Sequence, residues 1–219
     1  MALLTDQSES PTLLLRVKEL EERQVAFRNS LVCAFHHLLD LKDINTGVHS
    51  TRLAEWALRV ARKMDIPEKH HYQVEVAALL HDVGKIGVPD AILKKSGPLT
   101  DEERTLINRH PEYSWSTLRL FAGLEEASLY ALHHHESMDG RGYPAGLRGS
   151  EIPLVSRIIS VIDAYDAMVS NRCYRRALSH GDAVSELVRR SGSMFDSEVV
   201  QAFIPIAEAE SAEVFTLVG

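Results

Sequence analysis

Residues 74–87 read VEVAALLHDVGKIG, a nearly unbroken apolar run that leads into a histidine, an aspartate and two glycines. The run predicts a helix from about His71 to Asp82 that is buried on most sides. An aspartate at the end of such a helix is costly to bury unless a cation compensates its charge. The His81-Asp82 pair alone also fits a helix end with ordinary hydrogen bonds, so its meaning depends on the rest of the chain.

Helical periodicity extends outward from this run over most of the 219 residues. A long helix is expected from about Pro11 to Leu39, a second one carries His49, and others follow at about 112–121, at 124–136 and from Pro153 onward. Glycine and proline gather at 83–99 and 139–149, which we expect to be ordered loops. Aromatic residues make up only 6% of the chain, and the whole pattern favours an all-α domain over a sheet protein.

The composition excludes several partners and locations. The formal net charge is −7, so the chain offers no basic surface for duplex nucleic acid or anionic lipid. No apolar run approaches the length of a membrane span, and the N-terminus lacks a secretory signal. Cys33 and Cys173 both fall within helical apolar patterns, where buried free thiols are expected. These features together predict a cytoplasmic protein.

The long N-terminal helix has a pattern of its own. Apolar residues recur near heptad spacing from Leu13 to Leu38, with charged residues between them. We therefore divide the chain into residues 1–39, a tail and a long helix, and residues 40–219, the domain that carries the histidine motifs. The helix fits two interpretations equally, because the repeat covers only about three heptads. It either packs on its own domain, or it forms a homodimer or carries a signal.

Histidines and carboxylates gather in the remaining segments. The chain has eleven histidines, and residues 134–136 read HHE directly before a glycine-rich loop. Successive helical residues point about 100° apart, so His133 is expected to turn away from the cleft. Asp163 falls inside an apolar helical run, where a carboxylate needs a partner. His49 and His110 are less informative alone. Without cysteine, the set suits a histidine–carboxylate site for iron, manganese or zinc, and not a structural zinc finger.

These motifs together resemble the HD-GYP domain, a bacterial branch of the HD superfamily of metal-dependent phosphohydrolases. The resemblance rests on HDVGKIGVPDAILKKSGPLT from His81, HHESMDGRGYPAG from His134 and SRIISVIDAYDAMVSNRCYR from Ser156, with His49 and His110-Pro111. It covers about residues 40–205, most of the chain. It implies an all-α helical bundle of the HD superfamily with the site at its centre.

The resemblance also implies a dinuclear metal centre. The ligands expected for one ion are His49, His81, Asp82 and Asp163, those for the other are His110, His134 and His135, and Asp82 bridges the two. Two divalent cations are implied, iron or manganese first, with zinc or nickel as alternatives. Some members hold a third ion through a glutamate four residues before the first histidine. Here that position is Asn45, a much weaker ligand, so only two ions are expected.

Further roles follow from the same resemblance. Asp82 and Lys85 are the expected catalytic residues, and Lys85 would contact the phosphate. Tyr143 would shape the nucleotide pocket, while Arg172 and Arg175 either approach the substrate or are ordinary surface charges. The surface of the loop around Tyr143 would dock diguanylate cyclases.

The function that the resemblance implies is hydrolysis of cyclic di-GMP to linear pGpG, GMP or both, by a water molecule that bridges the two metal ions. Two alternatives stay open. The substrate is another cyclic dinucleotide such as cyclic GMP-AMP, or another phosphate ester. Otherwise, the chain is a non-catalytic receptor for cyclic di-GMP. Degenerate members of the family usually lose the metal ligands or the GYP loop, and this chain keeps both, which favours catalysis.

Overall fold

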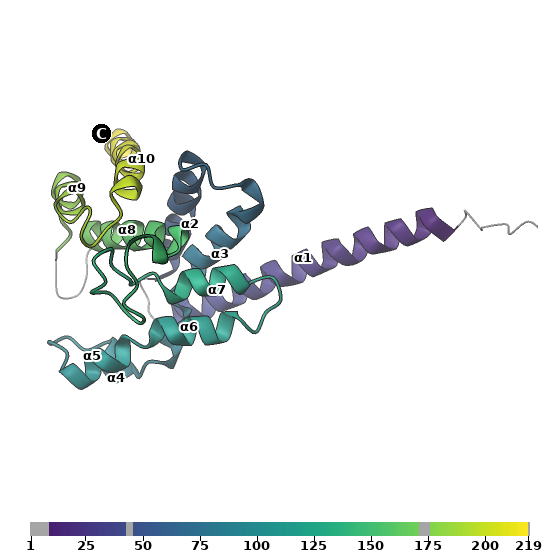
Figure 1. The fold of residues 1–219 in the computed structure, drawn as a ribbon, viewed down its shortest axis with the longest axis horizontal. Helices are drawn as coiled ribbons and strands as arrows, with labels where there is room; N and C mark the ends of the chain where they lie inside the picture. The colour runs from purple at the N-terminus through teal and green to yellow at the C-terminus, as the bar shows by residue number, and fades with distance from the viewer. Residues whose placement is uncertain (1–8, 43–45, 171–175, 219) are drawn as a thin grey trace, which may run out of the picture.

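The computed structural model describes residues 9–42, 46–170 and 176–218, which fold into helices joined by short connections (Figure 1). The α-helices are α1 (Glu9–Lys42), α2 (Thr46–Lys63), α3 (His71–Leu80), α4 (Asp90–Leu93), α5 (Asp101–Ile107), α6 (His110–Leu118), α7 (Glu125–Leu132), α8 (Leu154–Val169), α9 (His180–Arg189) and α10 (Ser197–Val218). Short 3₁₀ helices are η1 (Glu68–His70), η2 (Val83–Gly87) and η3 (Gly149–Glu151). Within the described ranges there is no β-strand, so the predicted all-α fold is confirmed.

The core lies where α2, α3 and α8 pack together, with α7 and α10 at its sides. The apolar run of α3 is buried as predicted, and Leu80 at its end has no exposed surface. Trp56 of α2 packs edge-on against Tyr165 of α8 and Phe203 of α10, with ring centroids 5.5 Å apart in both pairs. Edge-on aromatic contacts of this kind are favourable. They join α10 to the two helices that carry His49 and Asp163.

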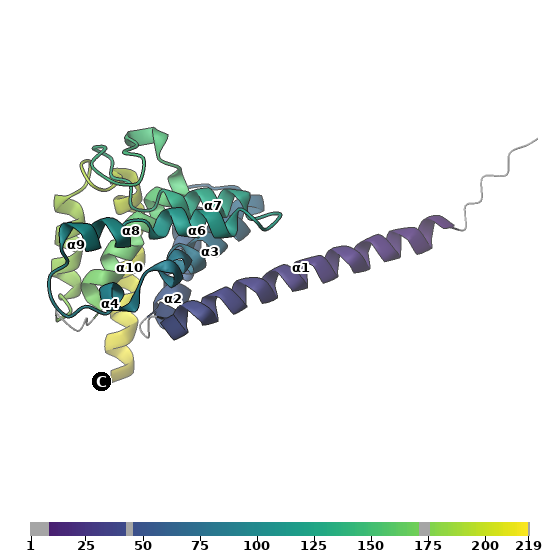
Figure 2. The same cartoon turned by 90° about the horizontal axis from the view of Figure 1, so that it is seen from below.

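The long N-terminal helix lies mostly outside this core. Figures 1 and 2 show α1 extending far beyond the body in two perpendicular views. Its C-terminal part packs on η2, α2 and α3, where Val32 and Leu39 are buried. The predicted long helix is confirmed, with ends at Glu9 and Lys42. Although α1 has 34 residues, neither it nor any other described helix combines the length and apolar character needed to cross a membrane.

One expectation about α1 is wrong. Cys33 has a free thiol, but its side chain is exposed and not buried. Neighbouring residues of a helix point about 100° apart. Because Val32 faces the body, Cys33 is turned off that face. The other cysteine, Cys173, lies outside the described residues.

Several helices have ends that differ from the sequence pattern, and the differences concern the histidines. The α3 helix ends at Leu80, before the His-Asp pair, and α7 ends at Leu132, so residues 133–135 lie in a turn. The α6 helix begins at His110, because Pro111 is tolerated in the first helical turn, where its missing N–H is not needed. The histidine motifs therefore lie at helix ends, where backbone groups lack partners within the helix.

Candidate metal centre

The turn after α3 holds His81 and Asp82 against the start of α6. Ser114 joins the two segments: its hydroxyl donates to the carbonyl oxygen of His81 at 2.7 Å and accepts from the N–H of Gly84 at 2.9 Å. A Cβ atom on Gly84 would lie 2.0 Å from the backbone oxygen of His110, so the position requires glycine. This close backbone contact brings His81, Asp82 and His110 together.

Three histidines are oriented in the same way, each by a carbonyl group three residues earlier. The Nδ1 atoms of His81, His110 and His134 lie 2.9, 2.7 and 2.7 Å from the carbonyl oxygens of Ala78, Ile107 and Ala131. A carbonyl oxygen only accepts, so Nδ1 carries a proton and donates. In the neutral ring, Nε2 then has the lone pair that binds a metal ion.

The Nε2 atoms of these three histidines are buried and have no hydrogen-bond partner within the described part of the chain, and the same is true of Oδ1 of Asp82. Oδ1 of Asp82 lies 3.1 Å from Nε2 of His110 and 3.9 Å from Nε2 of His134. Buried polar atoms without partners are rare and costly. Acceptor atoms that face one another in this way are stabilised by a cation between them.

The predicted ligands form two adjacent groups, and in each group the ligand atoms lie within 4.8 Å of one another. The first group is His49, His81 and Asp163, and the second is Asp82, His110, His134 and His135. Asp82 reaches both, since its Oδ2 is 3.4 Å from Nε2 of His81 while its Oδ1 faces the second group. The structure thus brings all the residues expected to bind metal into one place, with Asp82 between the two groups.

His49 of the first group differs in protonation from His134 and His135 of the second. Burial lowers the pKa of His134 well below its usual value, and burial with the nearby His110 lowers that of His135 to about 3. Both rings are therefore neutral at pH 7, the form that binds metal. Burial also lowers the pKa of His49, but its hydrogen bonds to Asp163 and Asp166 outweigh this effect and raise the pKa to about 9. In the metal-free protein, His49 is therefore protonated at neutral pH.

Lys85 lies on η2 next to the shared carboxylate. Its Nζ is 2.5 Å from Oδ2 of Asp82. Burial alone raises the pKa of Asp82, but the positive charges of Lys85 and His81 reverse this and hold the pKa well below its usual value. Asp82 is therefore ionised, and a lysine ammonium group lies at the edge of the two ligand groups.

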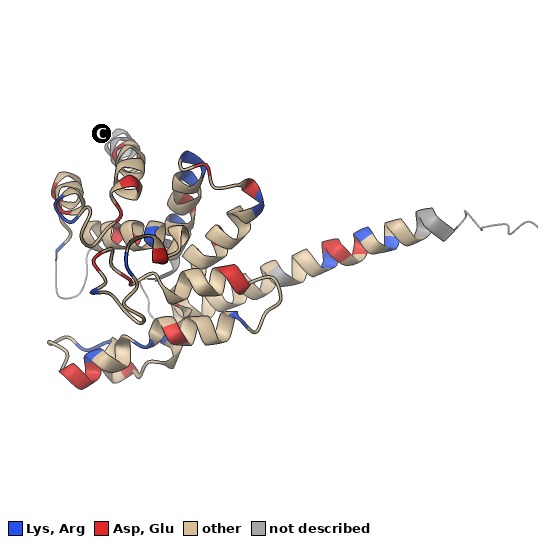
Figure 3. Cartoon of the chain, in the orientation of Figure 1, with Lys and Arg blue, Asp and Glu red and all other residues tan. Residues whose placement is uncertain are grey.

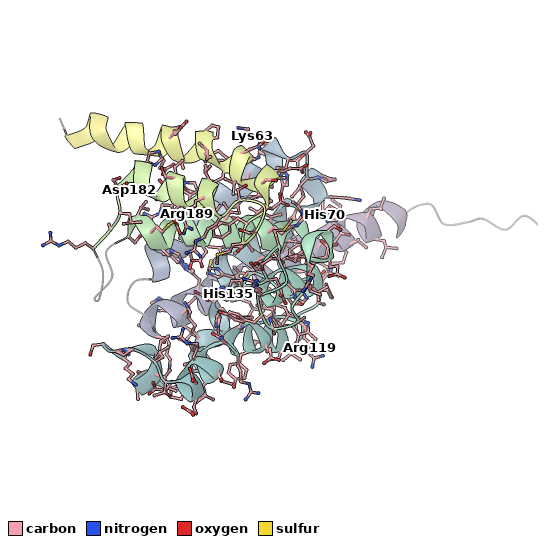
Figure 4. The ribbon with its side chains drawn as sticks, turned by 60° about the vertical axis from the view of Figure 1, so that its left-hand side comes forward. Lys63, His70, Arg119, His135, Asp182 and Arg189 are labelled. Carbon is pink, nitrogen blue, oxygen red and sulfur yellow. The ribbon has the colours of Figure 1, made fainter. Side chains whose placement is uncertain are left out.

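Tyr143 lies against the second group. Its ring centroid is 4.8 Å from that of His135, with an interplanar angle of 30°, and its N–H donates to the carbonyl oxygen of His135 at 3.2 Å. The buried carboxylate of Glu136 fixes the loop by accepting from the N–H groups of Ala145 at 2.7 Å and Leu147 at 3.1 Å. Residues 139–149 therefore form an ordered loop, as predicted. Figure 4 shows His135 in the middle of the body.

Asp166 is part of the site, and the sequence reasoning missed it. Its Oδ2 accepts a hydrogen bond from Nδ1 of His49, and its Oδ1 accepts from Arg52, with Nε at 2.7 Å. A carboxylate that holds a metal-binding histidine in this way fixes the tautomer of the ring and raises its basicity. A signal was present, because Asp163 and Asp166 are three residues apart in an apolar helix and so share one face.

Some of the predicted residues lie outside the two ligand groups or outside the part of the chain that the structure describes. Arg172 and Arg175, expected near the substrate, and Asn45, expected to limit the metal count, lie outside the described residues. His133 belongs to neither group, and its Nδ1 is 3.7 Å from Glu136. It was expected to turn away because of helical geometry, whereas it follows the end of α7.

Comparison with known proteins agrees with this geometry. The family model for the HD domain matches residues 34–199. A cyclic di-GMP phosphodiesterase of Thermotoga maritima is 38% identical over 180 residues, which cover 81% of this chain and 49% of that protein. A 3'3'-cGAMP-specific phosphodiesterase of Vibrio cholerae is 35% identical over 177 residues, covering 81% of this chain and 38% of that protein. The chain thus spans half or less of the length of these curated relatives.

A solved structure shares the fold. The cyclic GMP-AMP specific phosphodiesterase V-cGAP3 of V. cholerae matches 81% of this chain and 48% of its own chain, with a TM-score of 0.63 and 18% identity. The HD family model covers most of the described body, and the HD pair and the GYP loop stand where the structure gathers the histidines. The chain therefore belongs to the HD domain family, in its HD-GYP branch.

Proposed function

We propose that this chain is a metal-dependent phosphodiesterase that hydrolyses cyclic di-GMP to linear pGpG, GMP or both. The observation that carries the proposal is the pair of adjacent histidine–carboxylate groups that meet at Asp82. Among the described residues, the buried Nε2 atoms of His81, His110 and His134 have no hydrogen-bond partner. The cyclic di-GMP phosphodiesterase of T. maritima, 38% identical to this chain, supports the choice of substrate.

The residues present fit two divalent cations. One would be held by His49, His81, Asp163 and Oδ2 of Asp82, and the other by His110, His134, His135 and Oδ1 of Asp82. Imidazole and carboxylate ligands without a thiolate suit iron, manganese, zinc or nickel, and we propose iron or manganese. When bound, two such ions polarise a phosphodiester and lower the pKa of a water molecule between them.

The side chains around this centre would position the substrate. Lys85 holds its ammonium group next to Asp82, so it would bind a phosphate oxygen and offset the charge that develops in the transition state. Tyr143 presents an aromatic ring beside His135, a surface on which a base or a ribose can pack. Asp166 would keep the ring of His49 in one orientation.

Cyclic GMP-AMP is the second candidate substrate. The V. cholerae relative named for that substrate is 35% identical to this chain over a similar length, so overall identity does not separate the two substrates. A receptor without catalysis is the third candidate. A panel of cyclic di-GMP, cyclic GMP-AMP and bis(4-nitrophenyl) phosphate, assayed without oxygen and with manganese or iron, separates all three. Binding without turnover of any of them would favour the receptor.

The decisive test pairs metal content with turnover, before and after Asp82→Ala. Anaerobically purified protein should contain two ions per chain and hydrolyse cyclic di-GMP, and Asp82→Ala should lose both properties. Glu75→Ala is the matched control, because Glu75 is exposed on the same helix that leads into the site. Hydrolysis of cyclic di-GMP by the Asp82→Ala variant would refute the proposed metal-dependent mechanism.

We also propose a homodimer through α1. One stripe of the helix repeats every seven residues and is exposed along its length: Leu13, Leu20, Phe27, Ala34 and Leu41. The face that packs on the body is a different one, with Val32 and Leu39 buried. The exposed stripe therefore has the pattern of a coiled-coil seam. Figure 3 shows charged residues of both signs along the projecting part of α1, as is usual beside such a seam.

The remaining parts of the proposal concern organisation, partners and location. The chain would divide into residues 1–39, for dimerisation or signalling, and residues 40–219, for catalysis. The outer surface of the loop at 139–149 would dock diguanylate cyclases. The protein would act in the cytoplasm, a reducing compartment in which the exposed thiol of Cys33 stays free.

A further inference from the structure

A cavity of about 560 Å³ opens beside the candidate metal centre. His135 and Tyr143, which belong to that centre and its covering loop, line part of it. Its other walls come from the glycine-rich loop, from Ser160 on α8 and from the turn between α9 and α10. Its volume lies within the roughly 300–1,000 Å³ that is typical of pockets for small-molecule ligands. The cavity therefore offers room for a ligand group next to the second set of histidines.

The walls of this cavity are joined by backbone hydrogen bonds. The N–H of Met138 donates to the carbonyl oxygen of Met194 at 3.2 Å, and the N–H of Asp139 donates to that of Ser193 at 2.8 Å. Gly142 lies so close to the preceding turn that a Cβ atom would be 2.4 Å from the backbone nitrogen of Ser137. The loop and the α9–α10 turn thus form one continuous wall. A preformed pocket of this kind costs little ordering entropy when a ligand binds.

Three arginines line the cavity, and they differ in what holds them. Glu186 binds Arg189 at 2.6 and 2.8 Å and Arg190 at 2.5 Å, so both guanidinium groups already have a carboxylate partner at hydrogen-bond distance. Arg141 makes an ion pair with Asp139 at the much longer distance of 3.8 Å, and its side chain is 88% exposed. Arg141 is therefore the cation at this cavity that can turn to a new anionic partner. Figure 4 labels Arg189 and His135, which both line this cavity.

We propose that this cavity binds the nucleotide that is not being cleaved, and that Arg141 binds the second phosphate of a cyclic dinucleotide. The inference rests on the proposed function and extends it to a residue outside the metal centre. A cyclic dinucleotide has two phosphodiesters in one ring. When one of them is at the metal centre, the other half of the ring must occupy neighbouring space. The lining of the cavity combines His135 and Tyr143 with arginine side chains, which suits a nucleotide with its phosphate.

The inference separates this substrate class from a small phosphodiester. Bis(4-nitrophenyl) phosphate has one phosphate and no second nucleotide, so it gains nothing from a group beyond the metal centre. A guanidinium–phosphate contact at an exposed position should improve binding of the dinucleotide about tenfold. Because that contact would be present in both the bound substrate and the transition state, its loss should raise KM and leave kcat almost unchanged.

The experiment compares Arg141→Ala and Arg141→Lys with unmodified, manganese-loaded protein on both substrates. For Arg141→Ala, the ratio of kcat/KM on cyclic di-GMP to kcat/KM on bis(4-nitrophenyl) phosphate should fall about tenfold, through KM. Arg141→Lys keeps the positive charge but not the planar guanidinium group with its paired donors, so the ratio should fall less in this variant. The matched control is Arg62→Ala, since Arg62 is exposed in the last turn of α2, and this variant should keep the ratio.

Two results would overturn the inference: an unchanged ratio in Arg141→Ala, or an equal loss on both substrates. Failure of the proposed function gives a different result, because the unmodified, metal-loaded protein would then not hydrolyse cyclic di-GMP. In that case calorimetric titration with cyclic di-GMP replaces kinetics. The inference then requires about tenfold weaker binding by Arg141→Ala, and equal affinities would refute it.

Discussion

Replacing Asp166 by asparagine tests how the first ligand group is built. The carboxylate is 2% exposed and accepts hydrogen bonds from His49 through one oxygen and from Arg52 through the other. Asparagine has the same size but only one acceptor oxygen. Whichever way the amide is turned, its NH₂ group therefore faces either the imidazole N–H or the guanidinium. One buried donor in the variant is left without an acceptor.

The size of the effect follows from these contacts. A hydrogen bond to a charged group contributes about 1.5–3 kcal/mol, and an unpaired buried donor costs about 1–3 kcal/mol. Arg52 is 32% exposed and can recover some hydration, so we expect Asp166→Asn to lower the free energy of unfolding by about 2 kcal/mol. Loss of a carboxylate behind a ligand histidine usually weakens metal binding about 10- to 100-fold, equivalent to about 1.4–2.8 kcal/mol. The expected weakening applies to the ion held by His49 only.

The assay is calorimetric titration of metal-free protein with Mn²⁺ near pH 9. At pH 7 the loss of Asp166 would also lower the pKa of His49, and weaker competition from protons would hide part of the effect. Near pH 9 the ring in the unmodified protein is about half deprotonated, so this compensation is small. Asp182→Asn is the control, because Asp182 is exposed on α9 and distant from His135 in Figure 4.

Two outcomes would refute this reasoning. If Asp166→Asn binds both ions as tightly as the unmodified protein, Asp166 does not orient His49. If both ions are weakened equally, the two groups are not separate sites. Circular dichroism and thermal unfolding of the metal-free variant exclude a simple loss of fold as the cause.

Three further predictions concern the turn, the protonation and the N-terminal helix. Gly84→Ala should lower the free energy of unfolding in urea by about 3 kcal/mol, because the new Cβ atom would lie 2.0 Å from a backbone oxygen. Gly97→Ala is the control, since a Cβ atom at that position has no heavy atom within 4 Å, and equal stabilities of the two variants would contradict the close contact at Gly84. His49 has a pKa of about 9 in the metal-free protein, so Mn²⁺ binding at pH 7 should release at least one proton, and the affinity for Mn²⁺ should rise about tenfold per pH unit up to about pH 9. Calorimetry in buffers of different ionisation enthalpy measures the number of protons released, and a value of zero would contradict the prediction. Leu20→Glu places a charge on the exposed heptad stripe of α1 and should give a monomer in analytical ultracentrifugation. Val25→Glu is the control, because Val25 is similarly exposed but does not belong to the stripe, and this variant should stay dimeric. A monomeric unmodified chain would refute the dimer.

Much of the fold could be predicted because burial imposes a period on the sequence. The apolar run of α3 marked the core, and Asp163 stood out as a carboxylate within an apolar helix. Asp166 lies three residues later in the same helix, but its partner Arg52 is 114 residues away in the sequence, and a pair at that distance leaves no local pattern that identifies the partner. The face of α1 that packs on the body was equally hidden. The spacing of its apolar residues was visible, but only the burial of Val32 separates the packed face from the exposed stripe.

The ends of helices explain both why the histidines point inward and why cations suit the site. The carbonyl oxygens that accept from His81, His110 and His134 belong to the last turns of α3, α5 and α7. Such carbonyls have no partner within their helix and carry the partial negative charge of the helix dipole. Three of these ends meet beside the carboxylates of Asp82 and Asp163, so negative potential accumulates around buried imidazole lone pairs. The same carbonyl groups thus fix the tautomer of each histidine and favour the charge of the ions. A histidine three residues after a carbonyl in the last turn of a helix, repeated on three helices, is consequently a stronger sign of a metal centre than any one of the motifs alone.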